Sequence, residues 1–176
     1  AASTAGFRRT KLNTVMMRGT NDDELAGLVQ FAVDQGLDIS FIEEMPLGDI
    51  HGRQNTYLSS EEARERLAPH FNLIPSTESS GGPARYWRIP GSETRVGFIT
   101  PHSHNFCATC NRVRVTVEGR LLLCLGHEHS LDLRGLLRRH PCDDAPVLAA
   151  IRQGLLRKPL RHEFDTGDVQ ILRFMN

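Results

Sequence analysis

The chain has 176 residues and 39% of them are apolar, enough for one domain of ordinary size, or one and a half small ones. Its 21 basic and 21 acidic side chains balance, which excludes general attraction to nucleic acid or to an acidic membrane surface, so any anion site must be local. No apolar run approaches the roughly 18 residues of a membrane span, and the first residues lack the apolar stretch of a secretory signal.

The first part of the chain predicts a strand, a helix and a second strand. Residues 11–17 (KLNTVMM) indicate a buried strand. The helix after it is expected to be capped by Asn21, with Glu24 completing a capping box, and to stop at Gly36. Residues 38–45 (DISFIEEM) indicate the second strand, which gives a βαβ unit with parallel strands. One such unit cannot cover both faces of a parallel sheet, so the chain is expected to be a piece of something larger.

The middle of the chain predicts short elements between turns. A second capping box begins at Ser59 and opens a short helix that ends near Pro69. Alternating polar and apolar residues predict an antiparallel pair of strands, 86–89 and 95–100. The other segments expected here are a polar loop over 46–57, an edge strand over 71–74 and a flexible turn over 78–83.

Three of the four cysteines lie together, as Cys107-x2-Cys110 and, after thirteen residues, Cys124. Clustered thiols of this kind fit a metal site better than a disulfide framework. A tight turn brings the sulfurs of the first two cysteines together, and a predicted hairpin over 112–125 returns the third. Cys142 has no partner spacing and is expected to be an ordinary loop thiol.

The register of this hairpin decides which side chains face Cys124. The turn is expected at Gly119, which supplies a positive φ. A plain two-residue turn places Cys124 opposite Val113, whereas a bulge at Gly119 places it opposite Arg114. The sequence leaves both registers open.

Two kinds of centre suit three thiolates. One is zinc with a histidine as the fourth ligand, and the other is an iron–sulfur cluster in which one iron has no protein ligand. Free thiols are the third alternative. Beside a metal, Arg112 and Arg114 would suit bidentate binding of phosphate or carboxylate, although alternating arginines on a hairpin most often form a solvated face. The histidines close in sequence are His102, His104, His127 and His129.

Two amphipathic helices, 131–139 and 147–156, are predicted after the cysteine-rich stretch. The basic run on the first of them is interpreted as a solvated face. Glu43 and Glu44 close the second strand without a paired histidine, so an acid–base role is not favoured for them.

Five stretches of the chain resemble one enzyme family. They are KLNTVMMRGTNDDE, FIEEMPLGD, GGPARYWRIP, GFITPHSHNFCATCNRVRVTVEGRLLLCLG and the closing LRFMN. Together they resemble molybdenum cofactor biosynthesis protein A (MoaA), the GTP 3′,8-cyclases, along nearly the whole chain. The CxxCNRxR…C signature is specific, and it favours an iron–sulfur cluster over zinc.

The resemblance implies an α/β fold. Residues 1–50 would be the last part, a βαβ unit, of an incomplete TIM-like radical SAM barrel. Residues 51–176 would be a C-terminal α+β iron–sulfur extension that binds GTP. In this family, an N-terminal cluster cleaves S-adenosylmethionine to a 5′-deoxyadenosyl radical. That radical removes the 3′ hydrogen of GTP, and the ribose carbon closes onto C8 of guanine to give (8S)-3′,8-cyclo-7,8-dihydroguanosine 5′-triphosphate.

The resemblance also implies which residues bind what. A C-terminal 4Fe–4S cluster, which holds the purine at its open iron, would be bound by Cys107, Cys110 and Cys124. The GTP contacts would be Lys11, Arg112, Val113 and Arg114. The residue near the adenosine of S-adenosylmethionine would be Met45.

The chain departs from the family pattern at three places. It has no CxxxCxxC motif for the radical-generating cluster, it lacks the closing Gly-Gly, and Ser40 stands where many members carry an arginine that contacts phosphate. The chain is therefore expected to be the C-terminal half of such a protein and inactive alone. An unpaired strand edge would make it poorly soluble or oligomeric.

The expected setting follows from the same resemblance. The protein would be cytoplasmic and its small-molecule partners would be GTP and, for the whole protein with its second 4Fe–4S cluster, S-adenosylmethionine. A homodimer is expected, with cyclic pyranopterin monophosphate synthase downstream, and neither nucleic acid nor a membrane as a partner. The alternative is a zinc-binding interaction or nucleic-acid module.

Overall fold

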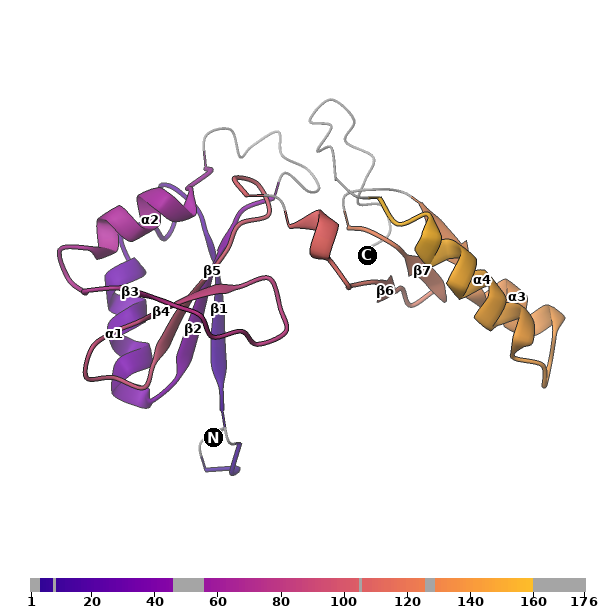
Figure 1. The fold of residues 1–176 in the computed structure, drawn as a ribbon, viewed down its shortest axis with the longest axis horizontal. Coiled ribbons are helices and arrows are strands. Elements are labelled where there is room, and N and C mark those ends of the chain that lie inside the picture. The colour runs from indigo at the N-terminus through magenta and orange to yellow at the C-terminus, as the bar shows by residue number, and fades with distance from the viewer. Residues whose placement is uncertain (1–3, 8, 46–55, 105, 126–128, 160–176) are drawn as a thin grey trace. The chain divides into compact units, whose positions relative to one another are not determined.

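The computed structural model describes residues 4–7, 9–45, 56–104, 106–125 and 129–159. It divides into two compact units (Figure 1). The first unit comprises residues 1–45 and 53–106, and the second comprises 46–52 and 107–176. Within the described ranges, no helix is both long and apolar enough to cross a lipid bilayer.

A mixed five-stranded sheet forms the centre of the first unit. Its strands, in chain order, are β1 (Lys11–Met16), β2 (Asp38–Glu43), β3 (Ile74–Ser76), β4 (Arg85–Arg88) and β5 (Arg95–Ile99). They lie in the order β1-β2-β5-β4-β3 (Figure 1). The strand β2 runs parallel to β1 and β5, β4 runs antiparallel to β5, and β3 runs antiparallel to β4. The predicted parallel pair is confirmed, with Lys11 opposite Asp38, and so is the predicted antiparallel pair, with Arg88 opposite Arg95. The described residues thus form a mixed α/β fold without a closed barrel.

The helix α1 (Leu25–Gln35) starts differently from the prediction. Its N-cap is Glu24, which makes no side-chain capping bond. The Asn21 side chain instead accepts a hydrogen bond from the Met17 N–H (2.9 Å) and donates one to the Val15 carbonyl (3.0 Å). Asn21 therefore closes the turn after β1, and its prediction as a helix cap is wrong.

Two other helix ends follow the prediction. Gly36 ends α1 in the left-handed region, with φ 64° and ψ 36°, and its N–H bonds to carbonyls of the last turn. The helix α2 (Ser60–Leu67) is capped by Ser59, whose hydroxyl accepts a hydrogen bond from the Glu62 N–H at 3.1 Å. Both ends are specified by residues adjacent in sequence.

Both helices pack on one face of the sheet. Apolar side chains that alternate along β2 and β5 bury themselves against α1 and α2. The fully buried members of this core are Met16, Leu25, Val29, Ala32, Ile39, Phe41, Leu58, Ala63, Leu67, Val96 and Phe98. Strand residues that alternate with these apolar positions, such as Ser40 between Ile39 and Phe41, point to the opposite face of the sheet.

Gly97 on β5 lies where a side chain would collide. A Cβ there would lie 2.6 Å from Ser40 Oγ and 2.9 Å from Tyr86 Cε1. We expect Gly97→Ala to lower the free energy of unfolding by about 1–3 kcal/mol, measured by urea denaturation, because neighbours must shift. Gly27 in α1, where a Cβ meets nothing within 4 Å, is the control: Gly27→Ala should be neutral or stabilising by up to about 1 kcal/mol. Equal destabilisation by both would contradict this packing.

In its described residues, the second unit contains a small antiparallel sheet and two helices. In chain order its elements are the 3₁₀ turn η1 (Cys107–Thr109), β6 (Arg114–Val115), β7 (Arg120–Leu122), β8 (Ser130–Asp132), α3 (Leu133–Arg139) and α4 (Ala145–Leu156). The strand order is β6-β7-β8. Both predicted helices are confirmed, but the first begins later than predicted because residues 130–132 pair as β8.

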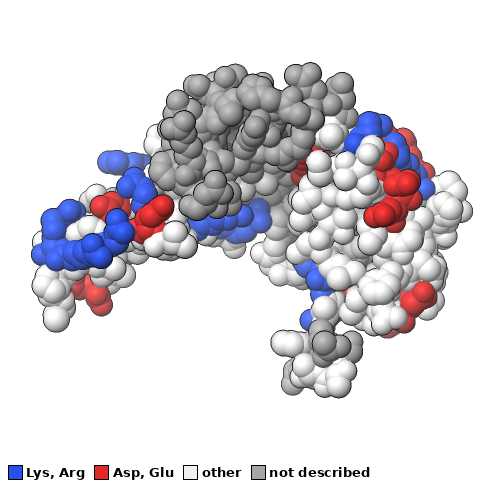
Figure 2. Space-filling view, turned by 180° about the vertical axis from the view of Figure 1, so that it is seen from behind, with Lys and Arg blue, Asp and Glu red and all other residues white. Residues whose placement is uncertain are grey.

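Basic side chains gather on this second unit, on the face that Figure 2 draws. The helix α3 contributes Arg134, Arg138 and Arg139, which are all exposed.

The helix α4 packs on the sheet through Gly154, where a Cβ would collide with the Leu131 side chain and lie 3.6 Å from Leu123 Cδ2. This close approach places the C-terminal end of α4 beside β8.

Candidate functional site

Glu43 joins three segments at the carboxyl end of the parallel strands. It closes β2 and is only 1% exposed. Its Oε1 accepts hydrogen bonds from the Ser60 N–H (2.9 Å) and the Ser103 hydroxyl (2.6 Å). Its Oε2 accepts from the Ser103 N–H (2.8 Å) and the His102 N–H (3.3 Å). One carboxylate thus ties the end of β2 to the start of α2 and to the loop after β5.

These contacts make Glu43 a structural anion. Burial raises the pKa of Glu43, but hydrogen bonds from Ser103 and Ser60 outweigh this effect and leave the pKa below its ordinary value. The carboxylate is therefore charged near neutral pH, with both oxygens occupied. The sequence did not reveal this role, because the partners come from segments far apart along the chain.

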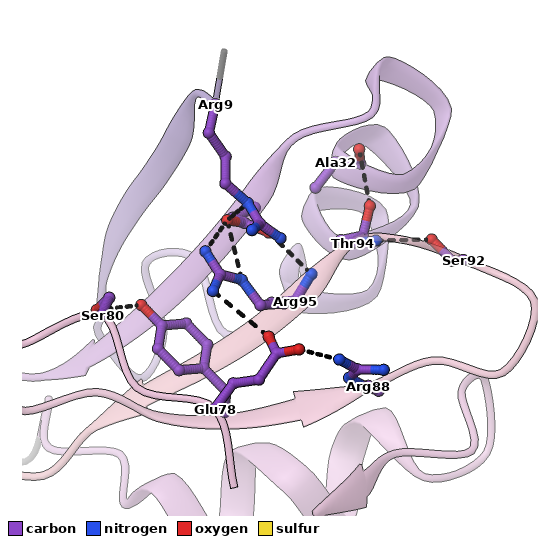
Figure 3. A network of polar contacts seen from close by, with 10 residues as sticks. Arg9, Ala32, Glu78, Ser80, Arg88, Ser92, Thr94 and Arg95 are labelled. Atoms are coloured by element: carbon purple, nitrogen blue, oxygen red, sulfur yellow. Dashed lines mark hydrogen bonds and ion pairs between the residues drawn. The ribbon is translucent and has the colours of Figure 1, made fainter. Parts of the chain in front are cut away.

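Asp38 anchors the opposite, amino end of the same strands, where it begins β2. Figure 3 draws its partners Arg9 and Arg95. It is 3% exposed and pairs with Arg95 at 2.7 Å and with Arg9 at 2.8 Å. Burial raises the pKa of Asp38, but hydrogen bonds from Arg95 and the charges of Arg95 and Arg9 hold it below its ordinary value. Arg95 also lies over the Tyr86 ring, 4.9 Å from its centroid. Glu78 extends the network, since it pairs with both Arg95 and Arg88.

Lys11 and Met45 lie near opposite ends of the parallel strands. Lys11 begins β1 on its exposed face, opposite Asp38. The charge of Lys11 acts on Tyr86. Burial raises the pKa of Tyr86, but the hydrogen bond with Ser80 and the charge of Lys11 bring this pKa below its ordinary value. Met45 is half-buried and follows β2. At about 3.3 Å per residue, roughly 20 Å separates the two positions along the sheet, so this unit does not bring them together.

The first two cysteines share one turn, as predicted. The Cys110 N–H donates to the Cys107 carbonyl at 3.0 Å and closes the 3₁₀ turn η1. Cys107, Cys110 and Cys124 are all half-buried and none forms a disulfide. Cys142 is also free and lies exposed in a loop, in agreement with its interpretation as an ordinary thiol.

The hairpin that carries Cys124 has a longer loop than predicted. The Thr116 N–H donates to the Arg120 carbonyl at 2.8 Å, and the Gly119 N–H donates to the Thr116 carbonyl at 2.9 Å. Residues 117–119 therefore form the loop, with Gly119 at φ 75°. A three-residue loop closed by a left-handed glycine is a common hairpin connection.

This loop sets a register that neither prediction anticipated. Arg114 lies opposite Leu122 in the β6–β7 ladder. Both predicted registers, which placed Cys124 opposite Val113 or opposite Arg114, are therefore wrong, since they would pair Arg114 with Leu123 or with Cys124. Cys124 lies two residues beyond the end of this ladder, after a bend at Leu123.

Positive charge acts on the thiol of Cys110. Burial raises the pKa of Cys110, but hydrogen bonds from Arg112 and the charges of Lys158 and Arg112 outweigh this effect and leave the pKa below its ordinary value. A thiolate, not a thiol, is the metal ligand. Cys107, Cys110 and Cys124 are half-buried and outside disulfides, and thiolates are the ligand type of an iron–sulfur cluster.

The histidines make other contacts. The ring centroids of His102 and Tyr57 lie 4.6 Å apart, with the rings tilted by 43°. His104 Nδ1 lies 3.4 Å from the Ser103 hydroxyl, whereas His127 is outside the described residues. In the described part of the chain, no three His, Cys, Asp or Glu side chains form a group that could hold a single metal ion.

The two units divide the predicted site residues. Arg112, Val113 and Arg114 are exposed on the hairpin of the second unit, beside the three cysteines. Lys11 and Met45 belong to the first unit. Ser40, where many family members carry arginine, is buried on β2. The sequence missed Lys158, which follows α4 and acts on Cys110 from far along the chain.

Comparisons with known proteins agree on one family. A family model described as Molybdenum Cofactor Synthesis C matches residues 37–164. The chain is 64% identical to GTP 3′,8-cyclase of Pseudomonas entomophila (strain L48) and 66% identical to that of Pseudomonas putida (strain W619). It is 63% identical to GTP 3′,8-cyclase of Marinobacter nauticus. Each match covers 100% of this chain and 54% of the relative, so the chain spans about half the length of the curated relatives it matches.

Proposed function

This chain belongs to the Molybdenum Cofactor Synthesis C family, and from that membership we propose that it is the C-terminal part of a GTP 3′,8-cyclase. The whole protein would convert GTP to (8S)-3′,8-cyclo-7,8-dihydroguanosine 5′-triphosphate by radical SAM chemistry, in molybdenum cofactor biosynthesis. This part would bind the substrate-side 4Fe–4S cluster and GTP. The observation that carries the proposal is the β6–β7 hairpin, which bears Arg114 and joins the turn of Cys107 and Cys110 to Cys124 along the chain.

The first unit supports a place in a radical SAM barrel. Three adjacent strands, β1, β2 and β5, run parallel, and β1 lies at one edge of the sheet. In the whole protein, earlier barrel strands would pair with that edge. We propose residues 1–50 as the last part of the incomplete TIM-like barrel and 51–176 as the iron–sulfur and GTP-binding region.

In the second unit, Cys107, Cys110 and Cys124 would hold the cluster. When bound, the cluster supplies an iron without a protein ligand, to which a purine can coordinate. Arg112 and Arg114 would bind the anionic parts of GTP through their guanidinium groups, with the backbone at Val113 as a further contact. Their charge is what a protein of zero net charge needs at an anion site.

The remaining contacts belong to the whole protein. Lys11 would bind GTP, and Met45 would lie near the adenosine of S-adenosylmethionine, which a second 4Fe–4S cluster cleaves. We further propose a cytoplasmic homodimer whose product passes to cyclic pyranopterin monophosphate synthase.

GTP binding to the anaerobically reconstituted chain tests this proposal. We expect Arg114→Ala to weaken GTP binding about 10-fold to 100-fold, because a hydrogen bond from a charged group is worth about 1.5–3 kcal/mol. Arg138→Ala removes an equally exposed arginine from α3 and should leave the affinity unchanged. Equilibrium dialysis with labelled GTP measures both. Equal affinities for the two variants, or uptake of zinc in place of iron, would count against the proposal.

A further inference from the structure

Lys158 connects the two segments that carry the cysteines. Its Nζ donates a hydrogen bond to the Arg112 carbonyl at 2.8 Å and another to the Leu123 carbonyl at 2.6 Å. Arg112 follows Cys110 by two residues, and Leu123 directly precedes Cys124. A single ammonium group therefore bridges the outgoing and the returning arm of the hairpin, next to ligands from both.

The hairpin ladder does not hold the arms together at this point. The last pair of the β6–β7 ladder is Arg114 with Leu122. This pair lies between the hairpin loop and the two carbonyls that Lys158 binds. The ammonium thus takes the place that a further pair of cross-strand bonds would occupy. Hydrogen bonds from a charged donor are shorter and roughly twice as strong as neutral ones, so one lysine can replace such a pair.

The position of Lys158 is fixed by its own surroundings. The helix α4 ends two residues earlier, and the Lys158 N–H bonds to the Leu155 carbonyl at 3.1 Å. Gly154 sits so close to Leu131 that a larger residue there would require the Leu131 side chain to move. Lys158 is half-buried, unlike the exposed Arg157 beside it. These features distinguish it from an ordinary surface lysine.

We propose that Lys158 is a positioning residue for the metal centre, which ties the Cys110 segment to the Cys124 segment and fixes a positive charge beside the thiolates. The inference rests on the proposed function, since it needs a cluster to position. A cubane cluster bound by three thiolates is anionic, so a fixed cation stabilises its binding. The same cation favours the reduced state, which carries one more negative charge.

Three variants test the inference. Lys158→Met keeps the length of the stem and removes the ammonium, Lys158→Arg restores charge and donors, and Arg157→Met is the neighbouring control. In the metal-free protein, hydrogen exchange over residues 110–124 should be faster for Lys158→Met only. After anaerobic reconstitution, Lys158→Met should lose iron to a chelator about 10-fold to 100-fold faster, and its cluster should have a more negative reduction potential. Lys158→Arg should behave like the parent chain.

The outcomes separate the two proposals. If the parent chain takes up iron and Lys158→Met matches it in exchange, iron loss and potential, the inference is overturned and the proposed function stands. If the parent chain takes up no iron, the proposed function fails and the inference fails with it. If circular dichroism reveals that Lys158→Met does not fold, Lys158→Arg decides: iron loss as slow as in the parent chain supports the inference, and rapid loss overturns it.

Discussion

Cys124→Ser is expected to abolish cluster binding while the hairpin stays folded. A serine hydroxyl has nearly the same shape as a thiol but does not provide the thiolate that iron requires. Iron per chain after anaerobic reconstitution should fall from about four to well below one, and the brown absorption should disappear with it. Chemical analysis of iron and sulfide, together with the visible spectrum, measures the effect. GTP affinity should fall as well, since the purine loses its iron.

Cys142→Ser is the matched control for this experiment. Cys142 is the remaining cysteine, exposed in the loop between α3 and α4, and it is not expected to bind iron. Its substitution should leave iron content, spectrum and GTP affinity unchanged. Retention of a full cluster by Cys124→Ser, or an equal loss in both variants, would contradict the assignment of the three ligands.

The sequence predicted features that depend on neighbouring residues. The Ser59 cap, the Gly36 stop and the turn that joins Cys107 to Cys110 each need only a few adjacent residues, and all three are present. Asn21 shows the limit of such reasoning. The same side chain that can cap a helix can also close a turn. Here Asn21 bonds to backbone groups at the end of β1, the Met17 N–H and the Val15 carbonyl.

Features that depend on distant segments were missed. The parallel pairing of β5 with β2 joins residues such as Val96 and Ile39, which no local pattern links. The predicted hairpin register was wrong because the same residues around Gly119 can form a two-residue or a three-residue loop. The choice depends on backbone angles that the sequence does not specify. Lys158 was missed because its hydrogen bonds go to backbone carbonyls, which every residue has and which no sequence pattern distinguishes.

Glu43→Gln is expected to destabilise the first unit by about 2–4 kcal/mol, because it leaves buried donors unpaired. Both oxygens of the Glu43 carboxylate accept from donors, Ser60 and Ser103 at Oε1, Ser103 and His102 at Oε2. Whichever way the glutamine amide turns, its NH₂ group faces an N–H donor. Glu65→Gln changes an exposed residue of α2 and should alter stability by less than about 0.5 kcal/mol. Urea denaturation followed by circular dichroism compares the two.

The pH dependence of this difference identifies its cause. Since the pKa of Glu43 is lowered by folding, its charged form stabilises the native state. That contribution is fully present above the unfolded-state pKa of about 4.3, and it is lost as the pH falls through the lower folded-state pKa. The stability gap between the parent chain and Glu43→Gln should therefore be constant near neutral pH and shrink below about pH 4. A gap that stays constant into acid would mean that the glutamine acts through packing and not through the lost charge.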